Sequence, residues 1–197
     1  KGETSILVAD LADRSTIADI AAAAVRPFGA PDILINAAGI NTRQPADDMT
    51  DAHWDLTQNL NVASPFFLAK AMVPGMRAKG WGRIINFASL QSRRAFANGI
   101  SYGASKGAVE QMTRAMAEAW SQDGITANAI APGFFRTELT APVFADPELS
   151  ARNAAQTCIG RNGEVHDMDG PMMFFCSNAS NYVTGQTLFV DGGYTAK

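Results

Sequence analysis

The sequence predicts an α/β fold in which helices cover both faces of a parallel sheet. Two observations lead to this prediction. Short β-rich runs alternate with longer helical runs along the chain, and the β-rich runs are almost continuously apolar. Strands buried on both faces have this composition, whereas a strand with one wet face alternates apolar and polar residues. We therefore expect one domain over residues 1–197, with a doubly wound sheet in three α/β/α layers.

Composition narrows the class of protein. The chain has 197 residues, of which 47% are hydrophobic and 18% charged, which suits a globular domain with a sizeable core. A net charge of −3 favours neither a nucleic acid nor an anionic membrane as partner. No apolar run reaches the roughly 18 residues that span a bilayer. Cys158 and Cys176 lack metal-ligand spacing, so no metal site is expected, and free thiols indicate the cytoplasm.

The elements follow from the pattern in chain order. Strands are expected at residues 4–10, 31–39, 82–89, 124–133 and 185–193, and helices at residues 14–29, 51–78, 101–122 and 164–177. The first helix should end near Pro27 and Gly29, since proline cannot continue a helix and glycine commonly ends one. Pro65 predicts a kink in the second helix, and the last helix is expected despite Pro171.

Residues able to form a site follow the expected strands. Asp10 lies at the carboxyl end of the first stretch, residues 36–39 at that of the second, Ser89 at that of the third, and Pro132 and Gly133 at that of the fourth. Parallel sheets of this kind bind ligands beyond the carboxyl ends of their strands. We therefore expect the site at that edge of the sheet.

The helix at residues 101–122 opens with Tyr102 and Lys106, four residues apart. Residues at i and i+4 lie on the same face of a helix, so both side chains point the same way. Residues 103–105, 107 and 108 are all small and let a ligand or another backbone approach closely. Taken alone, the pair is more typical of an ordinary helix start.

The rest of the chain supplies the context that the pair lacks. In order, the sequence contains NAAG, NLNV, INFASL, YGASK, NAIAPGFFRTEL and YVTGQTLFVDGG. This series resembles the classical short-chain dehydrogenase/reductase family over essentially the whole chain, and the spacing of thirteen residues between Ser89 and Tyr102 is usual there. The resemblance implies a Rossmann-type fold and a nicotinamide-dependent oxidoreductase.

The resemblance implies a catalytic set of Asn61, Ser89, Tyr102 and Lys106. Tyr102 would be the general acid/base, but an ordinary tyrosine pKa of about 10 is too high for proton exchange near neutral pH. The Lys106 ammonium and an oxidised nicotinamide ring would favour the phenolate. Ser89 would hydrogen-bond the substrate oxygen, and Lys106 would also bond the nicotinamide ribose. Asn61 would hold a water in a proton relay to Lys106. The alternatives are a capping role for Ser89 and an interior polar role for Asn61.

The resemblance also implies NAD or NADP as cofactor. Asp10 would hydrogen-bond the adenine, although a carboxylate at a strand end commonly begins a turn. Tyr102 and Lys106 would contact the nicotinamide half. The remaining cofactor residues would be those beneath the adenine ribose and those bordering the nicotinamide amide and diphosphate: Asn36, Ala37, Ala38 and Gly39, and Pro132, Gly133 and Thr137.

One feature of the family is not found in the sequence. No Gly-rich turn that would cradle a pyrophosphate follows a strand near the first residue. The resemblance implies that the chain begins around the family's third strand, so we expect the N-terminal strands to be absent from this chain. The residue that separates NAD from NADP belongs to that segment, which leaves both cofactors open.

Loops after the strands carry candidate substrate residues. Arg43 follows the second strand, and Gln91, Arg93 and Arg94 lie between Ser89 and Tyr102. A guanidinium group matches a carboxylate bidentately, so three arginines on two loops favour an anionic substrate, although any one alone is more typical of the surface. Residues 134–160 resemble a substrate-binding lid.

The stretches GINTRQPADDM, SLQSRRAF and DGGYTAK resemble the gluconate 5-dehydrogenase and 2-deoxy-gluconate 3-dehydrogenase branch of the family. This implies hydride transfer between the cofactor and a secondary alcohol or ketone of a sugar acid such as gluconate. A 3-oxoacyl-carrier-protein reductase is the alternative enzyme, and a non-catalytic dinucleotide-binding scaffold is the alternative from another class.

A homotetramer is implied as well, because family members commonly pair two long helices across a two-fold axis. Here these are the helices at residues 51–78 and 101–122. Apolar residues recur at helical spacing in the second of them, and an interface or an ordinary core-facing stripe would both show this spacing: Val109, Met112, Met116 and Trp120.

Overall fold

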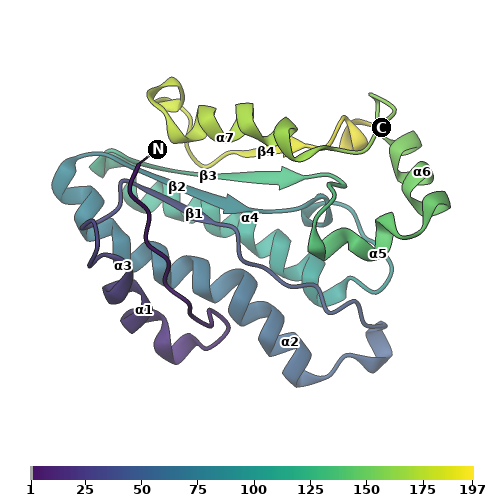
Figure 1. Cartoon of the computed structure of the whole chain (residues 1–197), viewed down its shortest axis with the longest axis horizontal. Coiled ribbons are helices and arrows are strands. Elements are labelled where there is room, and N and C mark those ends of the chain that lie inside the picture. Colours follow the sequence, from purple (N-terminus) through teal and green to yellow (C-terminus); the bar gives the residue numbers. More distant parts are fainter. Residues whose placement is uncertain (1) are drawn as a thin grey trace.

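The computed structural model describes residues 2–197 and confirms the parallel α/β arrangement (Figure 1). The strands are hydrogen-bonded side by side in the order β1-β2-β3-β4, and every neighbouring pair is parallel. In the register, Ile35 pairs with Ile85, which in turn pairs with Asn128. The strands are β1 (Ile33–Asn36), β2 (Gly82–Phe87), β3 (Ile125–Pro132) and β4 (Thr187–Val190).

Helices lie on both faces of this sheet (Figure 1). Adjacent residues of β2 show the two cores, since Ile84 packs with Met76 and Met116 while Ile85 packs with Phe175. Successive strand side chains point to opposite faces, so each apolar strand buries both of its sides. The helices are α1 (Ile17–Ala24), α2 (Asp51–Gln58), α3 (Ser64–Lys79), α4 (Ile100–Trp120), α5 (Ala141–Phe144), α6 (Pro147–Gln156) and α7 (Asp169–Cys176).

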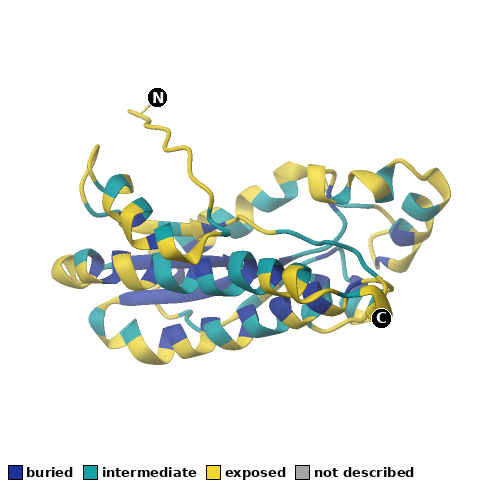
Figure 2. Ribbon diagram, turned by 90° about the horizontal axis from the view of Figure 1, so that it is seen from below, coloured by how far each residue is buried: buried dark blue, intermediate teal, exposed yellow. Residues whose placement is uncertain are grey.

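The strand predicted at residues 4–10 is not formed. These residues run as an exposed segment, with Ile6 90% and Val8 92% exposed (Figure 2). A strand is held by the backbone hydrogen bonds to its neighbour, and within residues 2–197 no strand pairs with this segment. The segment is instead tethered where it meets α3, because the Ser64 hydroxyl donates to the Leu11 carbonyl.

Two predicted helices are shorter than expected. The one at residues 14–29 consists of a 3₁₀ turn (Arg14–Thr16) and α1, which ends at Ala24, before Pro27. The one at residues 164–177 begins as a 3₁₀ turn (Val165–Met168), and α7 follows. Pro171 therefore stands in the first turn of α7, where a missing N–H breaks no helical hydrogen bond.

The kink predicted at Pro65 takes the form of a π-helical turn, Asn59–Ala63, between α2 and α3. The Ser64 N–H bonds the Asn59 carbonyl, five residues back. In an α-helix the N–H of residue 65 would bond the Asn61 carbonyl, and proline has no N–H. The sequence therefore interrupts the helix at Asn61, and π turns are frequent at functional sites.

The apolar stripe of α4 faces the core, so of the two alternatives that its spacing allows the structure shows the core-facing one. Val109 and Met116 are 1% and 2% exposed, and Met112 and Trp120 pack against the same clusters. Helical spacing cannot distinguish the two outcomes, because a core stripe and an interface stripe share it. Within residues 2–197, no helix combines the length and hydropathy needed to cross a bilayer.

Candidate active site

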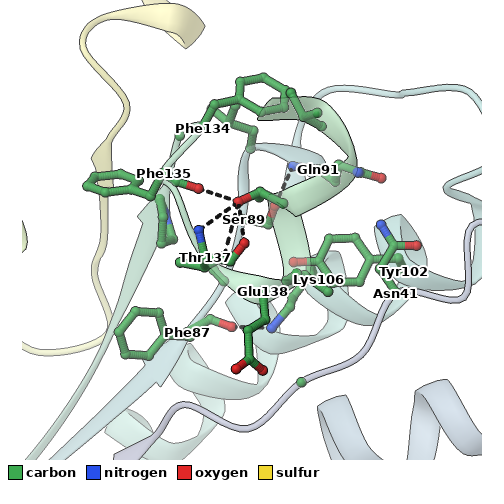
Figure 3. Close-up of a pocket in the computed structure, with 18 of the residues that line it drawn as sticks. Asn41, Phe87, Ser89, Gln91, Tyr102, Lys106, Phe134, Phe135, Thr137 and Glu138 are labelled. Carbon is green, nitrogen blue, oxygen red and sulfur yellow. Dashed lines mark hydrogen bonds between the residues drawn. The ribbon is translucent and has the colours of Figure 1, made fainter. Parts of the chain in front are cut away.

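A cavity of about 800 Å³ opens at the carboxyl ends of β1, β2 and β3 (Figure 3). It lies at the edge of the sheet that the sequence analysis predicted, and its volume is typical of a small-molecule site. Most of the predicted site residues line it: Ala37, Gly39, Arg43, Ser89, Gln91, Tyr102, Lys106, Pro132, Gly133 and Thr137.

Lys106 lies at the floor of the cavity, on the same face of α4 as Tyr102. Its ammonium Nζ donates to the Phe87 carbonyl at 2.6 Å and lies 5.6 Å from the centre of the Tyr102 ring. The side chain is almost completely buried, and this desolvation lowers the pKa of Lys106 to about 8. The lysine is thus held in place and loses its proton more readily than an ordinary lysine.

Tyr102 is buried, and its ring faces the cavity beside Ser89 (Figure 3). Burial raises the pKa of the phenol, while hydrogen bonding with Ser89 and the charge of Arg43 act in the lowering direction. The sequence predicts that the charge of Lys106 lowers this pKa. Desolvation of the phenolate dominates instead, so the neutral phenol is favoured in the cofactor-free cleft.

Ser89 lines the cavity and also caps the turn that follows β2. Its hydroxyl accepts a hydrogen bond from the Gln91 N–H at 3.1 Å, which caps the 3₁₀ turn Leu90–Ser92. The capping role and the position beside Tyr102 are therefore compatible. The cap holds the serine at the end of β2.

Asn61 is 1% exposed and does not line the cavity. Its Oδ1 accepts from the Ile40 N–H, and its Nδ2 donates to the Ile40 carbonyl and to the Ser105 hydroxyl, each at 2.9 Å. The amide thus connects the loop after β1 to α4, one turn from Tyr102. Both of its N–H donors are engaged, so a water relay would have to use another atom of this residue.

Arg43 reaches across the cavity. Its φ of 51° lies in the left-handed region, which is uncommon for a residue other than glycine. The Asn41 side chain supports this turn by accepting from the Arg43 N–H at 3.1 Å. The guanidinium Nη2 donates to the Leu139 carbonyl at 2.5 Å, which connects the loop after β1 to the segment after β3.

Arg93 and Arg94 lie away from the cavity, contrary to the sequence-based expectation. Arg93 Nη2 pairs with Glu110 Oε1 of α4 at 2.9 Å, and its guanidinium lies over the Phe189 ring. Arg94 Nη1 donates to the Lys197 carbonyl at 3.4 Å. The 3₁₀ turn after Ser89 directs the chain toward Glu110, a buried carboxylate that attracts a cation.

Three predicted cofactor residues also lie off the cavity: Asp10, Asn36 and Ala38. The exposed Asp10 carboxylate accepts from the Ala12 N–H at 2.9 Å, which is the turn-forming alternative. Asn36 is buried, and its Nδ2 donates to Asn86 Oδ1 at 2.9 Å, across to β2. This amide pair joins two strands and does not face the cavity.

Several lining residues are not singled out individually by the sequence, although those at 134–143 fall within the stretch 134–160 that resembles a lid. They are mainly apolar and aromatic and come from three segments: Phe87, Phe96, Phe134, Phe135, Leu139, Val143, Val165 and Met168. Asn41 and Glu138 add polar groups (Figure 3). Apolar residues in loops were the available signal, since a loop with no ligand or neighbour to cover has little use for them.

The floor of the cavity fits the nicotinamide end of a dinucleotide. A Cβ added at Gly39 would stand 3.3 Å from Asn61 Oδ1 and 3.6 Å from Lys106 Nζ. Glycine at this position therefore leaves the ammonium accessible from the cavity. Lys106 and the Tyr102 hydroxyl are the donors on this side, and Thr137 lies on the segment after β3. Among the described residues, no group of three or more His, Cys, Asp or Glu is placed to hold a metal ion.

Comparison with known proteins identifies the family to which the chain belongs. Residues 1–195 match a family model described as enoyl-(acyl carrier protein) reductase. The chain belongs to the short-chain dehydrogenase/reductase family of NAD(P)-dependent oxidoreductases.

Individual relatives are similar over nearly the whole chain. The gluconate 5-dehydrogenase of Gluconobacter oxydans is 39% identical over 98% of this chain and 75% of that protein. The galactitol 2-dehydrogenase (L-tagatose-forming) of Cereibacter sphaeroides is 41% identical over 96% of this chain and 75% of that protein. A crystal structure of a Burkholderia cenocepacia gluconate 5-dehydrogenase with NADP and tartrate has a TM-score of 0.91 at 39% identity. The match covers 95% of this chain and 74% of the Burkholderia cenocepacia chain.

Proposed function

We propose that this protein interconverts a secondary alcohol and a ketone of a sugar acid such as gluconate, with NAD or NADP as cofactor. The observation that carries the proposal is the grouping of Ser89, Tyr102, Lys106 and Arg43 around one cavity. The first three residues provide proton chemistry at a hydroxyl group, and Arg43 provides a cation for a carboxylate. When bound, the nicotinamide ring accepts or supplies the hydride.

Tyr102 is the acid/base in this proposal. In alcohol oxidation its phenolate accepts the proton of the substrate hydroxyl, and in ketone reduction the phenol returns a proton to the forming alkoxide. Ser89 holds the substrate oxygen near the phenol, because its hydroxyl lies beside Tyr102 at the end of β2. Lys106 holds the nicotinamide ribose and stabilises the phenolate by its charge.

Asn61 contributes through its main chain rather than its amide. The amide hydrogens are engaged by Ile40 and Ser105. The Asn61 carbonyl, in contrast, lacks its usual helical donor because that donor would be the absent N–H of Pro65. A carbonyl of this kind is suited to hold the water that relays a proton toward Lys106.

Arg43 binds the substrate carboxylate. It lines the same cavity as Tyr102. Gln91 is a second candidate substrate residue, because it lines the cavity beside Ser89. Residues 134–160 form the lid, since Phe134, Phe135, Thr137, Glu138, Leu139, Thr140 and Val143 all border the cavity.

The test compares Arg43→Ala with Arg94→Ala on gluconate and on a neutral polyol such as galactitol. A charge-assisted hydrogen bond contributes roughly 1.5–3 kcal/mol, or about 10- to 150-fold in binding. Arg43→Ala should raise the KM for gluconate by about that factor and the KM for galactitol much less. Arg94→Ala, which removes a guanidinium outside the cavity, should change neither.

Other outcomes favour other functions. An equal penalty on both substrates, with galactitol preferred by the wild type, would favour a polyol dehydrogenase, as the galactitol 2-dehydrogenase relative suggests. Turnover of a 3-oxoacyl thioester alone would favour a carrier-protein reductase. Cofactor binding without turnover of any of these would favour a scaffold.

We infer that the protein acts as a homotetramer in the cytoplasm. Family resemblance supports the tetramer, as does the outward face of α4, where the small exposed residues Ala104, Ala115 and Ala119 permit close helix packing. Free thiols at Cys158 and Cys176 support a reducing compartment. A monomeric mass by light scattering would refute the tetramer, and recovery from an extracytoplasmic fraction of the native cells would refute the location.

A further inference from the structure

Three aromatic rings from distant parts of the chain meet beside the cavity. Phe96 lies on the loop before α4, Phe134 follows β3, and Tyr194 follows β4. The ring centres are 5.9 Å apart for Phe96 and Phe134, 5.8 Å for Phe134 and Tyr194, and 6.2 Å for Phe96 and Tyr194. These are distances at which aromatic pairs attract each other, and each ring contacts both of the others.

The three rings have different positions relative to the cavity. Phe96 and Phe134 line it, whereas Tyr194 does not and is only 8% exposed. Tyr194 therefore supports the two phenylalanines from behind. The two rings that a substrate would meet depend on a third ring that it would not touch.

Tyr194 is itself held firmly by its loop. The Asp191 carboxylate accepts from the Gly193 N–H at 2.9 Å, the Thr195 N–H at 2.9 Å and the Thr195 hydroxyl at 2.7 Å. The Asp191 carbonyl also accepts from the Tyr194 N–H at 3.1 Å. Hydrogen bonds to a carboxylate are among the stronger ones in proteins, so the ring has a fixed base.

The same loop holds the far end of the lid. The Gly192 carbonyl accepts from the Ile159 N–H at 3.2 Å, and Lys197 Nζ donates to the Thr157 carbonyl at 2.9 Å. A Cβ on Gly193 would stand 2.7 Å from Cys158 Sγ, so this contact is close. Both ends of residues 134–160 thus rest on the loop after β4: Phe134 through Tyr194, and residues 157–159 directly.

We propose that Tyr194 is a positioning residue that sets the size of the substrate chamber and the resting place of the lid. This inference rests on the proposed function for its substrate. The ring rather than the hydroxyl has the role, because no hydrogen bond of that hydroxyl occurs within residues 2–197. In the proposed function, the C–H groups of the sugar acid pack against Phe96 and Phe134, which line the cavity.

The test uses Tyr194→Ala, Tyr194→Leu and the conservative Tyr194→Phe, with Tyr182→Ala as the matched control. Tyr182 is fully exposed, so its loss should change nothing. Loss of an aromatic contact of this kind changes an equilibrium constant by about 2- to 12-fold. Tyr194→Ala should raise the KM for gluconate by at least that factor with kcat little changed. The same variant should also raise the kcat/KM for a gluconate bearing a bulky O-alkyl group, relative to the kcat/KM for gluconate itself. Tyr194→Phe should restore wild-type values.

A second readout does not depend on activity. Arg136 and Arg152 are exposed trypsin sites within the lid. Native-state cleavage there should be severalfold faster in Tyr194→Ala, intermediate in Tyr194→Leu, and unchanged in Tyr194→Phe and Tyr182→Ala. Should gluconate not be a substrate, this result would still stand and only the proposed function would fail. Unchanged cleavage in Tyr194→Ala, or equal losses in Tyr194→Ala and Tyr194→Phe, would overturn the inference. If Tyr194→Ala does not fold, the comparison of Tyr194→Leu with Tyr194→Phe decides the outcome.

Discussion

The Lys106 ammonium nitrogen lies 2.6 Å from the carbonyl oxygen of Phe87, and the lysine is only 4% exposed. The end of β2 therefore holds the charged group of α4 at the floor of the cavity. One hydrogen bond to a carbonyl does not replace the hydration of an ammonium, and the pKa of Lys106 accordingly falls to about 8. The protein keeps a destabilising charge at the place where the proposed chemistry uses it.

This burial predicts how stability depends on pH. An unfolded lysine titrates near 10.4, so a folded pKa of about 8 corresponds to a penalty of about 3 kcal/mol. The penalty is fully present below pH 8 and disappears as the pH rises through the unfolded value, because the unfolded chain binds more protons in that window. Lys106→Met should therefore raise the free energy of unfolding of the cofactor-free protein more at pH 7 than at pH 10.5. Urea denaturation at both pH values measures this, and an equal change at both would contradict it.

Tyr102→Phe keeps the ring and removes the acid/base. Turnover should fall by at least ~10²-fold, the low end for a positioned proton donor, while cofactor affinity should barely change. Because burial raises the pKa of Tyr102, wild-type alcohol oxidation should also accelerate with rising pH, since it needs the phenolate. Steady-state kinetics in both directions and a cofactor titration provide the measurement. Turnover within a few-fold of the wild type would remove Tyr102 from this role.

Arg93 should act on the arrangement of the catalytic residues rather than on the substrate. It pairs with Glu110, and the neighbouring Ser92 hydroxyl donates to the Lys106 carbonyl at 2.8 Å, so both attach the loop after Ser89 to α4. Arg93→Ala should cost roughly 1–2 kcal/mol of stability, a modest value because the arginine is half exposed. It should lower kcat on acid and polyol alike. Denaturation and kinetics beside Arg94→Ala test this, and a penalty confined to gluconate would restore Arg93 as a substrate residue.

Gly124 should be the more sensitive of two glycines with the same backbone conformation. Gly124 and Gly29 both have a φ of 79°, but a Cβ on Gly124 would stand 2.1 Å from the Gly80 carbonyl oxygen, whereas one on Gly29 would meet nothing within 4 Å. Gly29→Ala should lower the free energy of unfolding by about 1–2 kcal/mol, because alanine is disfavoured in the left-handed backbone conformation. Gly124→Ala should cost clearly more, because the backbone of α3 and β3 must separate. Thermal unfolding of the two variants compares them, and equal losses would count against the contact.

The sequence by itself determined the parallel α/β architecture, the edge of the sheet that carries the site, and the shared face of Tyr102 and Lys106. It also determined where the long helix breaks, because Pro65 has no N–H to give to Asn61. These features depend on periodicity, on spacing within one helix and on single-residue chemistry. Such properties are local, so they can be read along the chain.

Only the tertiary structure decided which charged and apolar groups reach the cavity. Arg93 is drawn to Glu110 on α4, while Arg43 crosses to Leu139, a residue far along the chain. Residues 4–10 stay exposed because no strand pairs with them within the described residues, and Tyr194 joins the site through Phe96 and Phe134. Each outcome depends on a partner distant in sequence, and the direction of a side chain follows the partner that packing brings to it.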